Sequence, residues 1–487
     1  MVTFFLKIEM LFSNKLMQKM NLKSLWNDFT YFPHQIQGIN WMLDMEKIGT
    51  IVPETEDIIR GGFQCDDMGL GKTIQIASVI INNMCDTLII SPLAMIQTWS
   101  SVLQNAECVV YEVNKSNWVL MNDPDRPIPC RKRPVVYITN YEKLYRRPTL
   151  FHRSWGRVVL DEAHKIRNGD SEVARCARKI VAPIRWAVTG TPLVNSKSDI
   201  SSLLAFIGVP YSPLWRWKPW YDTILPDLLI HRALTVDIKG APPKPEIYNI
   251  DLPFITKTEE EFYYGVQGAT ESMLVKYSSE ILSSFEMFKL LLRLRQISVH
   301  PQVYINAKRR ENSRYPREDW IAPSTKIEKI KEIITTDTGI HKYIIFCQFN
   351  DEMNIIRESL SGIIKEDNIL QYSGSMNQKE RTEVLDKSKK TTEKTVMLIQ
   401  LQAGGVGLNL QEYDRIIFVS PWWTSALMDQ AIARAVRMGQ TQIVKVYNLK
   451  LDAENSKTIN IDNMVNSKAE EKRKMLEKLF EMCARDY

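Results

Sequence analysis

The chain has 487 residues, of which 44% are hydrophobic and 25% charged, and 63 Lys and Arg against 57 Asp and Glu give a formal net charge of +6. This length excludes a single small domain, and the composition is typical of a globular protein rather than of a disordered or strongly basic tail. The sequence contains no run of roughly 18 apolar residues, so we expect no helix that crosses a membrane.

The chain begins with a short apolar segment that Lys7 and Glu9 interrupt. No small-residue cleavage site follows, so this segment differs from a secretion signal, and we predict an N-terminal helical extension over residues 1–30. The seven cysteines are scattered, and none forms a C-x-x-C pair. We therefore expect a reducing compartment rather than secretion, and no structural zinc.

Short β-branched runs alternate with longer helical stretches in two blocks of the sequence. Near-continuous apolar runs are typical of strands covered on both faces, as in parallel sheets with crossover helices. The pattern therefore predicts two α/β domains. The expected strands are 63–65, 87–91, 108–112, 135–139, 157–161 and 185–189 in the first block, and 343–347, 396–400, 415–420 and 443–449 in the second.

A proline-rich run at 241–245 separates the two blocks, because proline lacks an N–H donor and cannot continue a helix or a central strand. Helical spacing without strand runs follows from 258 to 302. Near the end of the chain, apolar residues at helical spacing predict an amphipathic helix that packs back on the second domain. The predicted division is 1–30, 31–240 (first lobe), 241–322 (linker and helical protrusions), 323–460 (second lobe) and 461–487 (C-terminal helix).

A glycine-rich segment, Asp66-Asp67-Met68-Gly69-Leu70-Gly71-Lys72-Thr73, lies between a short apolar run and a helical stretch. This is the context of a phosphate-binding loop, in which backbone N–H groups and a helix N-terminus approach the phosphates. Lys72 would reach the β- and γ-phosphates, and the Thr73 hydroxyl would bind Mg²⁺. Asp66 stands where such loops usually have their first glycine, and a glycine-rich turn with an exposed lysine is the alternative.

The run Arg157–Asp161 ends in two adjacent carboxylates, Asp161 and Glu162, followed by Ala163 and His164. One carboxylate at the end of a strand can hold Mg²⁺, and the next can polarise an attacking water. A solvated pair of loop acids is the alternative for this motif alone. Two parts of one ATP site in the right order favour the catalytic interpretation.

Together these motifs resemble the DEAH-box-like motor core of a SWI/SNF-type ATPase of helicase superfamily two, from about Phe32 almost to the C-terminus. The resemblance implies two tandem RecA-like P-loop lobes that use ATP and Mg²⁺. Pro33-His34-Gln35 resembles the segment that recognises adenine. The cofactor-binding residues it implies are Gln35, Asp67, Met68, Gly69, Leu70, Gly71, Lys72, Thr73 and Gly407, with Thr73 and Asp161 as the Mg²⁺ ligands.

Further segments resemble the motifs that transmit hydrolysis to movement. Thr189-Gly190-Thr191-Pro192 resembles the coupling motif, and 429–440 resembles the arginine-finger motif. Arg434 and Arg437 would share one face of a helix and reach a developing phosphate charge. The resemblance implies Lys72, Glu162, Arg434 and Arg437 as catalytic residues, and His164, Gly190, Thr191 and Gln430 as coupling residues.

Two other segments, 87–93 with Gln97 and Trp99, and 138–142, resemble the motifs that contact DNA in this family. The pair His231-Arg232 departs from the family's arginine pair. One branch of the family carries a cysteine-rich ubiquitin-ligase insert, and the absence of cysteines between Cys176 and Cys347 argues against such an activity.

The resemblance implies a motor that hydrolyses ATP to move along double-stranded DNA and remodel protein–DNA complexes, with protein partners for targeting. A strand-separating DNA or RNA helicase is one alternative, and a degenerate nucleic-acid-binding scaffold is another. A bare motor core is similar to those of large DNA viruses, so we expect the nucleus or a cytoplasmic site of viral replication. We also expect the small positive excess to gather between the lobes.

Overall fold

The computed structural model describes residues 22–52, 55–115, 117–122, 133–194, 196, 198–209, 220–233, 241–277, 284–401, 408–437, 439–453 and 460–483. Gly407 and residues 1–21 of the predicted N-terminal extension lie outside these ranges. The described part of that extension is not helical, which corrects the prediction. It folds as a turn, because Ser24 Oγ donates hydrogen bonds to the carbonyl oxygens of Trp26 and Phe29.

The first lobe is built on a nine-stranded sheet whose inner strands are all parallel, with antiparallel pairs only at β1 and β5. The strand order is β1-β2-β8-β7-β3-β6-β4-β5, and β9 pairs with β2. Each run predicted in the first block is a strand here. The strands are β1 (Thr50–Ile51), β2 (Ile58–Gln64), β3 (Thr87–Ser91), β4 (Val109–Asn114), β5 (Asn117–Leu120), β6 (Val135–Asn140), β7 (Arg157–Asp161), β8 (Ile184–Val188) and β9 (Leu229–Ile230).

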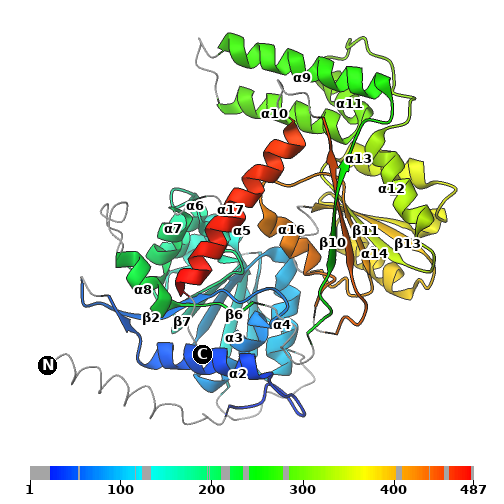
Figure 1. Ribbon diagram of the computed structural model, residues 1–487. Helices are drawn as coiled ribbons and strands as arrows, with labels where there is room; N and C mark the ends of the chain where they lie inside the picture. Colours follow the sequence, from blue (N-terminus) through cyan, green and yellow to red (C-terminus); the bar gives the residue numbers. More distant parts are fainter. Residues whose placement is uncertain are drawn as a thin grey trace.

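Helices cover both faces of this sheet, as crossover connections between parallel strands require (Figure 1). They are α2 (Pro33–Lys47), α3 (Lys72–Asn82), α4 (Ile96–Asn105), α5 (Tyr141–Arg146), α6 (Glu172–Lys179), α7 (Ser198–Ile207) and α8 (Trp220–Leu228), with 3-10 turns η1 (Leu93–Met95), η2 (Pro148–Phe151) and η3 (Ala163–Ile166). Several of these begin where a strand ends, so loop residues gather at the carboxyl edge of the sheet.

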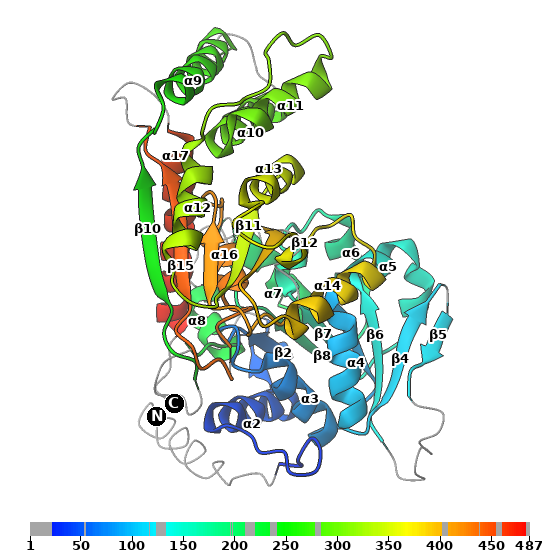
Figure 2. The same cartoon turned by 90° about the vertical axis from the view of Figure 1, so that its right-hand side faces the viewer.

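The second lobe has a six-stranded, fully parallel sheet in the order β10-β15-β14-β11-β13-β12 (Figure 2). Its strands are β10 (Glu246–Leu252), β11 (Lys342–Cys347), β12 (Ile369–Tyr372), β13 (Thr395–Gln400), β14 (Arg415–Phe418) and β15 (Lys445–Leu451). The predicted linker segment 241–322 thus contributes an edge strand, β10, to this sheet. Most side chains of β10 are exposed, so the strand lacks the apolar run that marked the others.

The helical protrusions predicted between the lobes are α9 (Lys257–Tyr277), α10 (Ser284–Val299) and α11 (Pro301–Glu311), which lie at the top of Figure 1. The other helices are α12 (Thr325–Thr336), α13 (Asn350–Leu360), α14 (Gln378–Lys390), α16 (Ser425–Ile432) and α17 (Ile461–Cys483), with the 3-10 turn η5 (Glu366–Asn368). The α/β class with two parallel sheets is therefore confirmed. None of the described helices is long and apolar enough to cross a membrane.

The C-terminal helix α17 crosses from one lobe to the other (Figure 1, red). Its first turns pack with the protrusions through Ile461 and Val465, whereas Leu479 and Cys483 join the core of the first lobe. The helix thus packs on both lobes, whereas the prediction placed it on the second domain alone. A helix of 23 residues is about 35 Å long, which is enough to reach both lobes.

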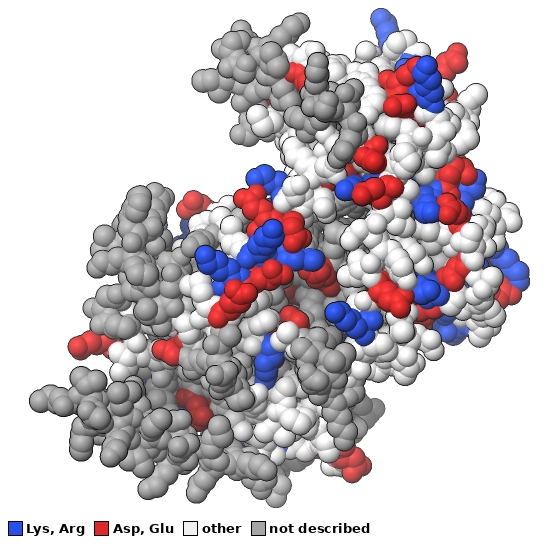
Figure 3. All heavy atoms as spheres, in the orientation of Figure 1, with Lys and Arg blue, Asp and Glu red and all other residues white. Residues whose placement is uncertain are grey.

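Charges on the face that α17 crosses are mixed in sign. Figure 3 shows Lys and Arg side chains interspersed with Asp and Glu among the described residues of this face. The described residues here form no patch of a single sign, and the expected concentration of positive charge is not visible from this side.

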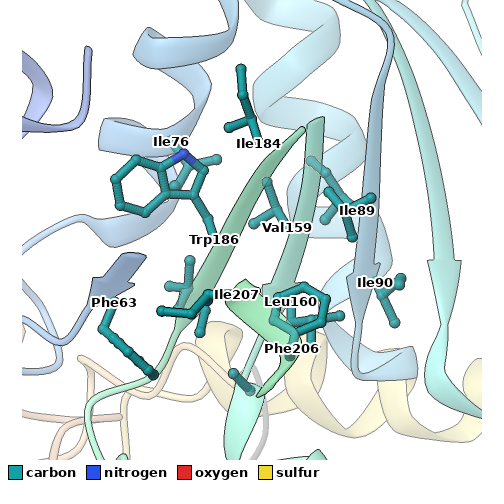
Figure 4. Close-up of a cluster of buried hydrophobic side chains, with 14 of the residues drawn as sticks. Phe63, Ile76, Ile89, Ile90, Val159, Leu160, Ile184, Trp186, Phe206 and Ile207 are labelled. Carbon is teal, nitrogen blue, oxygen red and sulfur yellow. The ribbon is translucent and has the colours of Figure 1, made fainter. Parts of the chain in front are cut away.

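The core of the first lobe consists of apolar side chains between the sheet and its helices. Figure 4 shows part of it, where Phe63, Val159 and Trp186 from neighbouring strands lie with Ile76 of α3 and Phe206 of α7. All five are almost fully buried. Tight packing of this kind fixes the strand ends that carry polar residues.

A buried ion pair fastens α2 to the start of β7. Arg157 Nε donates to Glu46 Oε1 at 2.6 Å, and both side chains are inaccessible to solvent. Trp186 Nε1 donates to the same Glu46 oxygen at 2.8 Å. Because β7 begins with Arg157 and ends with Asp161, this contact fixes the base of the strand that carries the acidic motif.

We expect Arg157→Met to destabilise the first lobe by about 3–5 kcal/mol, because the substitution leaves the Glu46 carboxylate buried without its cation. Scanning calorimetry would measure the fall in Tm. The exposed pair Lys387–Asp367, at 3.0 Å, provides the control: Lys387→Met should cost about 0–1 kcal/mol. Equal Tm values for the two variants would contradict the structural role of the buried pair.

Candidate functional site: a nucleotide site between the lobes

The predicted phosphate loop leaves β2 and enters α3 through two glycines in the left-handed region. Gly69 has φ +89° and Gly71 has φ +80°. The positive φ of Gly71 favours glycine, and a Cβ there would lie 2.5 Å from Gln35 Nε2, so a larger residue would also have to displace that side chain. The loop therefore presents backbone N–H groups at the N-terminus of α3, which suits phosphate.

The side chains expected to contact nucleotide lie around this loop. Lys72 is the first residue of α3, and its Nζ donates to the carbonyl oxygens of Asp66 at 2.7 Å and Asp67 at 3.2 Å. Gln35 lies on the other side: its Oε1 accepts from Phe32 N at 3.1 Å and its Nε2 donates to Leu70 O at 3.4 Å. The structure thus brings the segment with Gln35 into contact with the loop.

Asp66, which stands at the usual glycine position, is a buried structural anchor. Its side chain is fully inaccessible, and both carboxylate oxygens accept hydrogen bonds from Arg232, with Nε to Oδ1 at 2.9 Å. Arg232 also donates to Gln75 Oε1 at 2.8 Å. The arginine follows β9, which is parallel to β2, so the two strand ends place it beside the loop. This role was not predicted from the sequence, although the apolar residues before His231 are a weak strand signal.

The acidic pair lies at the end of β7. Asp161 Oδ2 accepts from Trp99 Nε1 at 2.8 Å and from Ser91 Oγ at 3.0 Å. Burial and then the charge of Glu162 together raise the pKa of Asp161 to about 6, while these two donors and Lys72 oppose the shift. The site therefore holds a carboxylate that a nearby cation would strongly favour in its charged form.

Glu162 has an unusual backbone conformation, with φ +53°, and it caps the short turn η3. Its Oε2 is buried, lies 3.4 Å from His164 Nδ1 and has no hydrogen-bond partner among the described residues. Strained, incompletely bonded carboxylates of this kind are typical of functional sites rather than of solvated loops. The alternative of a solvated acid pair does not fit this geometry.

The predicted coupling residues of the first lobe lie between the acids and the phosphate loop. His164 Nδ1 is 3.2 Å from Thr189 Oγ1, which accepts from Thr191 N at 3.1 Å. Burial lowers the pKa of His164 to about 3, so its ring is neutral. A Cβ on Gly190 would lie 3.7 Å from Lys72 Nζ, so this glycine lies close to the lysine. A continuous series of contacts thus runs from the acidic pair to the phosphate loop through His164, Thr189 and Gly190.

Two residues in the segments that resemble DNA-contacting motifs have an internal position instead. Trp99 is fully buried and bonds to Asp161, and Tyr141 is buried with its hydroxyl donating to Asp161 O at 2.7 Å. Burial removes both side chains from any surface contact with DNA. They orient the acidic motif.

Arg434 and Arg437 follow α16, which ends at Ile432, so the prediction that they share one face of a helix is wrong. The chain turns there because Arg434 N bonds to Ala431 O and Arg434 O accepts from Leu410 N at 3.0 Å. Of the two, Arg434 faces the first lobe.

Arg434 is only 7% exposed, and the charges of Glu162 and Asp161 raise its pKa against the larger lowering by burial. Arg437 instead donates to Leu408 O at 3.4 Å, and burial together with Arg434 lowers its pKa. Gln430 is buried in α16. A cation of the second lobe therefore approaches the carboxylates of the first.

Residues 34–303 match the SNF2-related domain family, and residues 325–439 match the helicase conserved C-terminal domain. The chain belongs to the SNF2-related family. Its two α/β lobes are accordingly those of a helicase-like motor, and the protein is a nucleic-acid-dependent ATP hydrolase.

The relatives of this SNF2-related chain include viral and cellular proteins. It is 27% identical to the probable global transactivator of Orgyia pseudotsugata multicapsid polyhedrosis virus, over 93% of this chain and 92% of that protein. It is 25% identical to the SWI/SNF-related regulator of chromatin subfamily A member 1 of Mus musculus, over 86% of this chain and 41% of the mouse protein. The chain therefore spans less than half the length of the mouse relative but nearly all of the viral one.

Among solved structures, the SNF2-related chain is similar to the Sulfolobus solfataricus SWI2/SNF2 ATPase core in complex with double-stranded DNA. The two are 22% identical with a TM-score of 0.40, and the match covers 96% of this chain and 100% of the other.

We expect Arg232→Met to lower ATP affinity by roughly tenfold or more, because the substitution leaves the buried Asp66 carboxylate without its cation and loosens the phosphate loop. Titration with a fluorescent ATP analogue would measure the change. The control, Arg175→Met, replaces an exposed arginine of α6 in the same lobe. Unchanged affinity in Arg232→Met would show that the pair does not position the loop.

Proposed function

We propose that the protein translocates along double-stranded DNA, driven by ATP hydrolysis, and thereby remodels protein–DNA complexes. The observation that carries this proposal is the match to the SNF2-related domain family; in addition, the charges of Glu162 and Asp161 in the first lobe act on Arg434 of the second. Catalysis would then require both lobes, so that each hydrolysis cycle changes the contact between them. Membership of the SNF2-related family supports nucleic acid as the partner.

In the first lobe, Lys72 and the N-terminus of α3 would hold the β- and γ-phosphates, and Gln35 would contact adenine. Glu162 would orient the attacking water, because its unbonded Oε2 is available to accept a hydrogen bond. Gly407, which lies outside the described residues, would approach the nucleotide from the second lobe.

Thr73 and Asp161 would hold Mg²⁺. Both residues offer oxygen ligands, which this cation prefers, and the buried carboxylate of Asp161 has a raised pKa that a nearby cation would offset. When bound, the ion supplies charge stabilisation at the phosphate oxygens.

Arg434 would stabilise the charge that develops on the transferred phosphate, with Arg437 as the second cation of the motif. His164, Gly190 and Thr191 would transmit the state of the nucleotide, because they connect Glu162 with the surroundings of Lys72. Gln430, on α16, would respond to the same change in the state of the nucleotide.

Duplex DNA would be bound through its phosphates, which requires no base sequence. Similarity to the viral protein, over nearly all of both chains, supports a role at viral DNA, in the nucleus or at a cytoplasmic replication site. Targeting would then depend on protein partners.

An ATPase assay with duplex DNA, single-stranded DNA and RNA tests this proposal. We expect duplex DNA to stimulate hydrolysis in the unaltered protein. Lys72→Ala and Glu162→Gln should each reduce the stimulated kcat by roughly a hundredfold or more, since one loses phosphate binding and the other loses water orientation. Their Tm values should stay close to that of the unaltered protein.

The control is Lys329→Ala, on α12 of the second lobe, which should keep full activity. Near-normal turnover in Lys72→Ala or Glu162→Gln would contradict the assignment of these residues to the ATP site. A forked-duplex assay run beside it separates the alternatives: strand release would favour a separating helicase, and no hydrolysis with any nucleic acid would favour a scaffold.

A further inference from the structure

We propose that helix α17 is a positioning element for ATP hydrolysis, acting through Phe480 at the phosphate loop and through Arg473 at the helix that leads to Arg434. This inference rests on the proposed function, since it assigns residues that set the geometry of that ATP site. The two contacts lie on one helix, whose course between the lobes Figure 1 shows.

The first contact is an aromatic stack beside the phosphate loop. The rings of Phe480 and His231 have centroids 3.6 Å apart and planes within 5°. His231 Nε2 lies 3.4 Å from Asp67 Oδ1, and Asp67 N donates to Arg232 O at 2.9 Å. Phe480 therefore packs on a ring that touches the loop itself.

The second contact is an ion pair with the helix that precedes Arg434. Arg473 donates to Asp429 Oδ1 at 3.0 Å, and Asp429 belongs to α16. The neighbouring residue, Lys472, donates from Nζ to Trp423 O at 3.2 Å, just before α16 begins. The middle of α17 thus contacts both α16 and the segment just before it. Helix α16 in turn leads to Arg434.

The two contacts are electrostatically linked across the lobe boundary. Burial raises the pKa of Asp429, and the charge of Asp67 raises it further, whereas Arg473 lowers it. The negative charge of Asp67, in the phosphate loop, thus acts on Asp429 of the second lobe. Arg473 supplies positive charge at this junction, which favours the approach of α16 to the first lobe.

The start of α17 is fixed in the second lobe. Asp462 Oδ2 accepts from Lys326 Nζ at 2.7 Å, and Ser298 Oγ donates to Asp462 Oδ1 at 2.7 Å, all in buried positions. With one end held here and the other in the core of the first lobe, α17 links the two lobes.

A purely structural role, in which α17 only covers apolar surface, makes a different prediction. Loss of cover would lower Tm without changing turnover at temperatures where the protein stays folded. Loss of positioning would lower kcat while the phosphate loop still binds ATP, because the transition state needs Arg434 and binding does not.

The test measures kcat and KM for ATP at saturating duplex DNA, well below Tm, in Phe480→Ala and Arg473→Ala. We expect kcat to fall roughly ten- to hundredfold in Phe480→Ala, as for small misplacements of catalytic groups, and about two- to fivefold in Arg473→Ala, whose ion pair is partly exposed. KM should change less than about threefold in both. Phe480→Tyr, which keeps the ring, should restore kcat. Lys478→Ala, exposed on the same helix, should match the unaltered protein.

A third comparison tests the route through His231. In a His231→Ala background, Phe480→Ala should lower kcat little further, because the two rings act as one unit. Additive losses would place the effect of Phe480 elsewhere and overturn this route.

Unaltered kcat in both Phe480→Ala and Arg473→Ala would overturn the positioning role. If Phe480→Ala is unfolded at the assay temperature, Arg473→Ala, at a side chain 40% exposed, decides alone. The proposed function fails separately, if duplex DNA does not stimulate hydrolysis in the unaltered protein.

Discussion

The site depends on the buried carboxylate of Asp161 at the end of β7. A carboxylate in such a place is costly unless donors or cations compensate it. Trp99 and Ser91 donate to it from neighbouring segments, and the charges of Lys72 and Arg434 act on it from the two lobes. Burial nevertheless raises the pKa of Asp161 to about 6. A bound cation would therefore favour the charged form of this carboxylate.

The same strand also fixes the site mechanically. Arg157 begins β7 and pairs with Glu46 of α2, the helix that also carries Gln35. The segment expected to contact adenine and the acids expected to act on phosphate are therefore joined through one buried ion pair. Breaking that pair should disturb the nucleotide site as well as the fold.

Features with local patterns were predictable from the sequence, and features made by distant contacts were not. The apolar runs of β3 and β7 gave their bounds, and the glycines of the phosphate loop predicted its shape, because both depend on neighbouring residues. Arg232 was missed, since its pairing with Asp66 depends on β9 lying beside β2. The edge strand β10 was missed because its exposed side chains lack an apolar run.

The central claim is that one ATP site is completed across the lobe boundary by Arg434. The most direct measurement is the duplex-stimulated ATPase of Arg434→Ala, with kcat and KM for ATP determined separately. The account predicts a fall in kcat of roughly 10³-fold or more, as for other arginine fingers, with little change in KM. A kcat equal to that of the unaltered protein would contradict it.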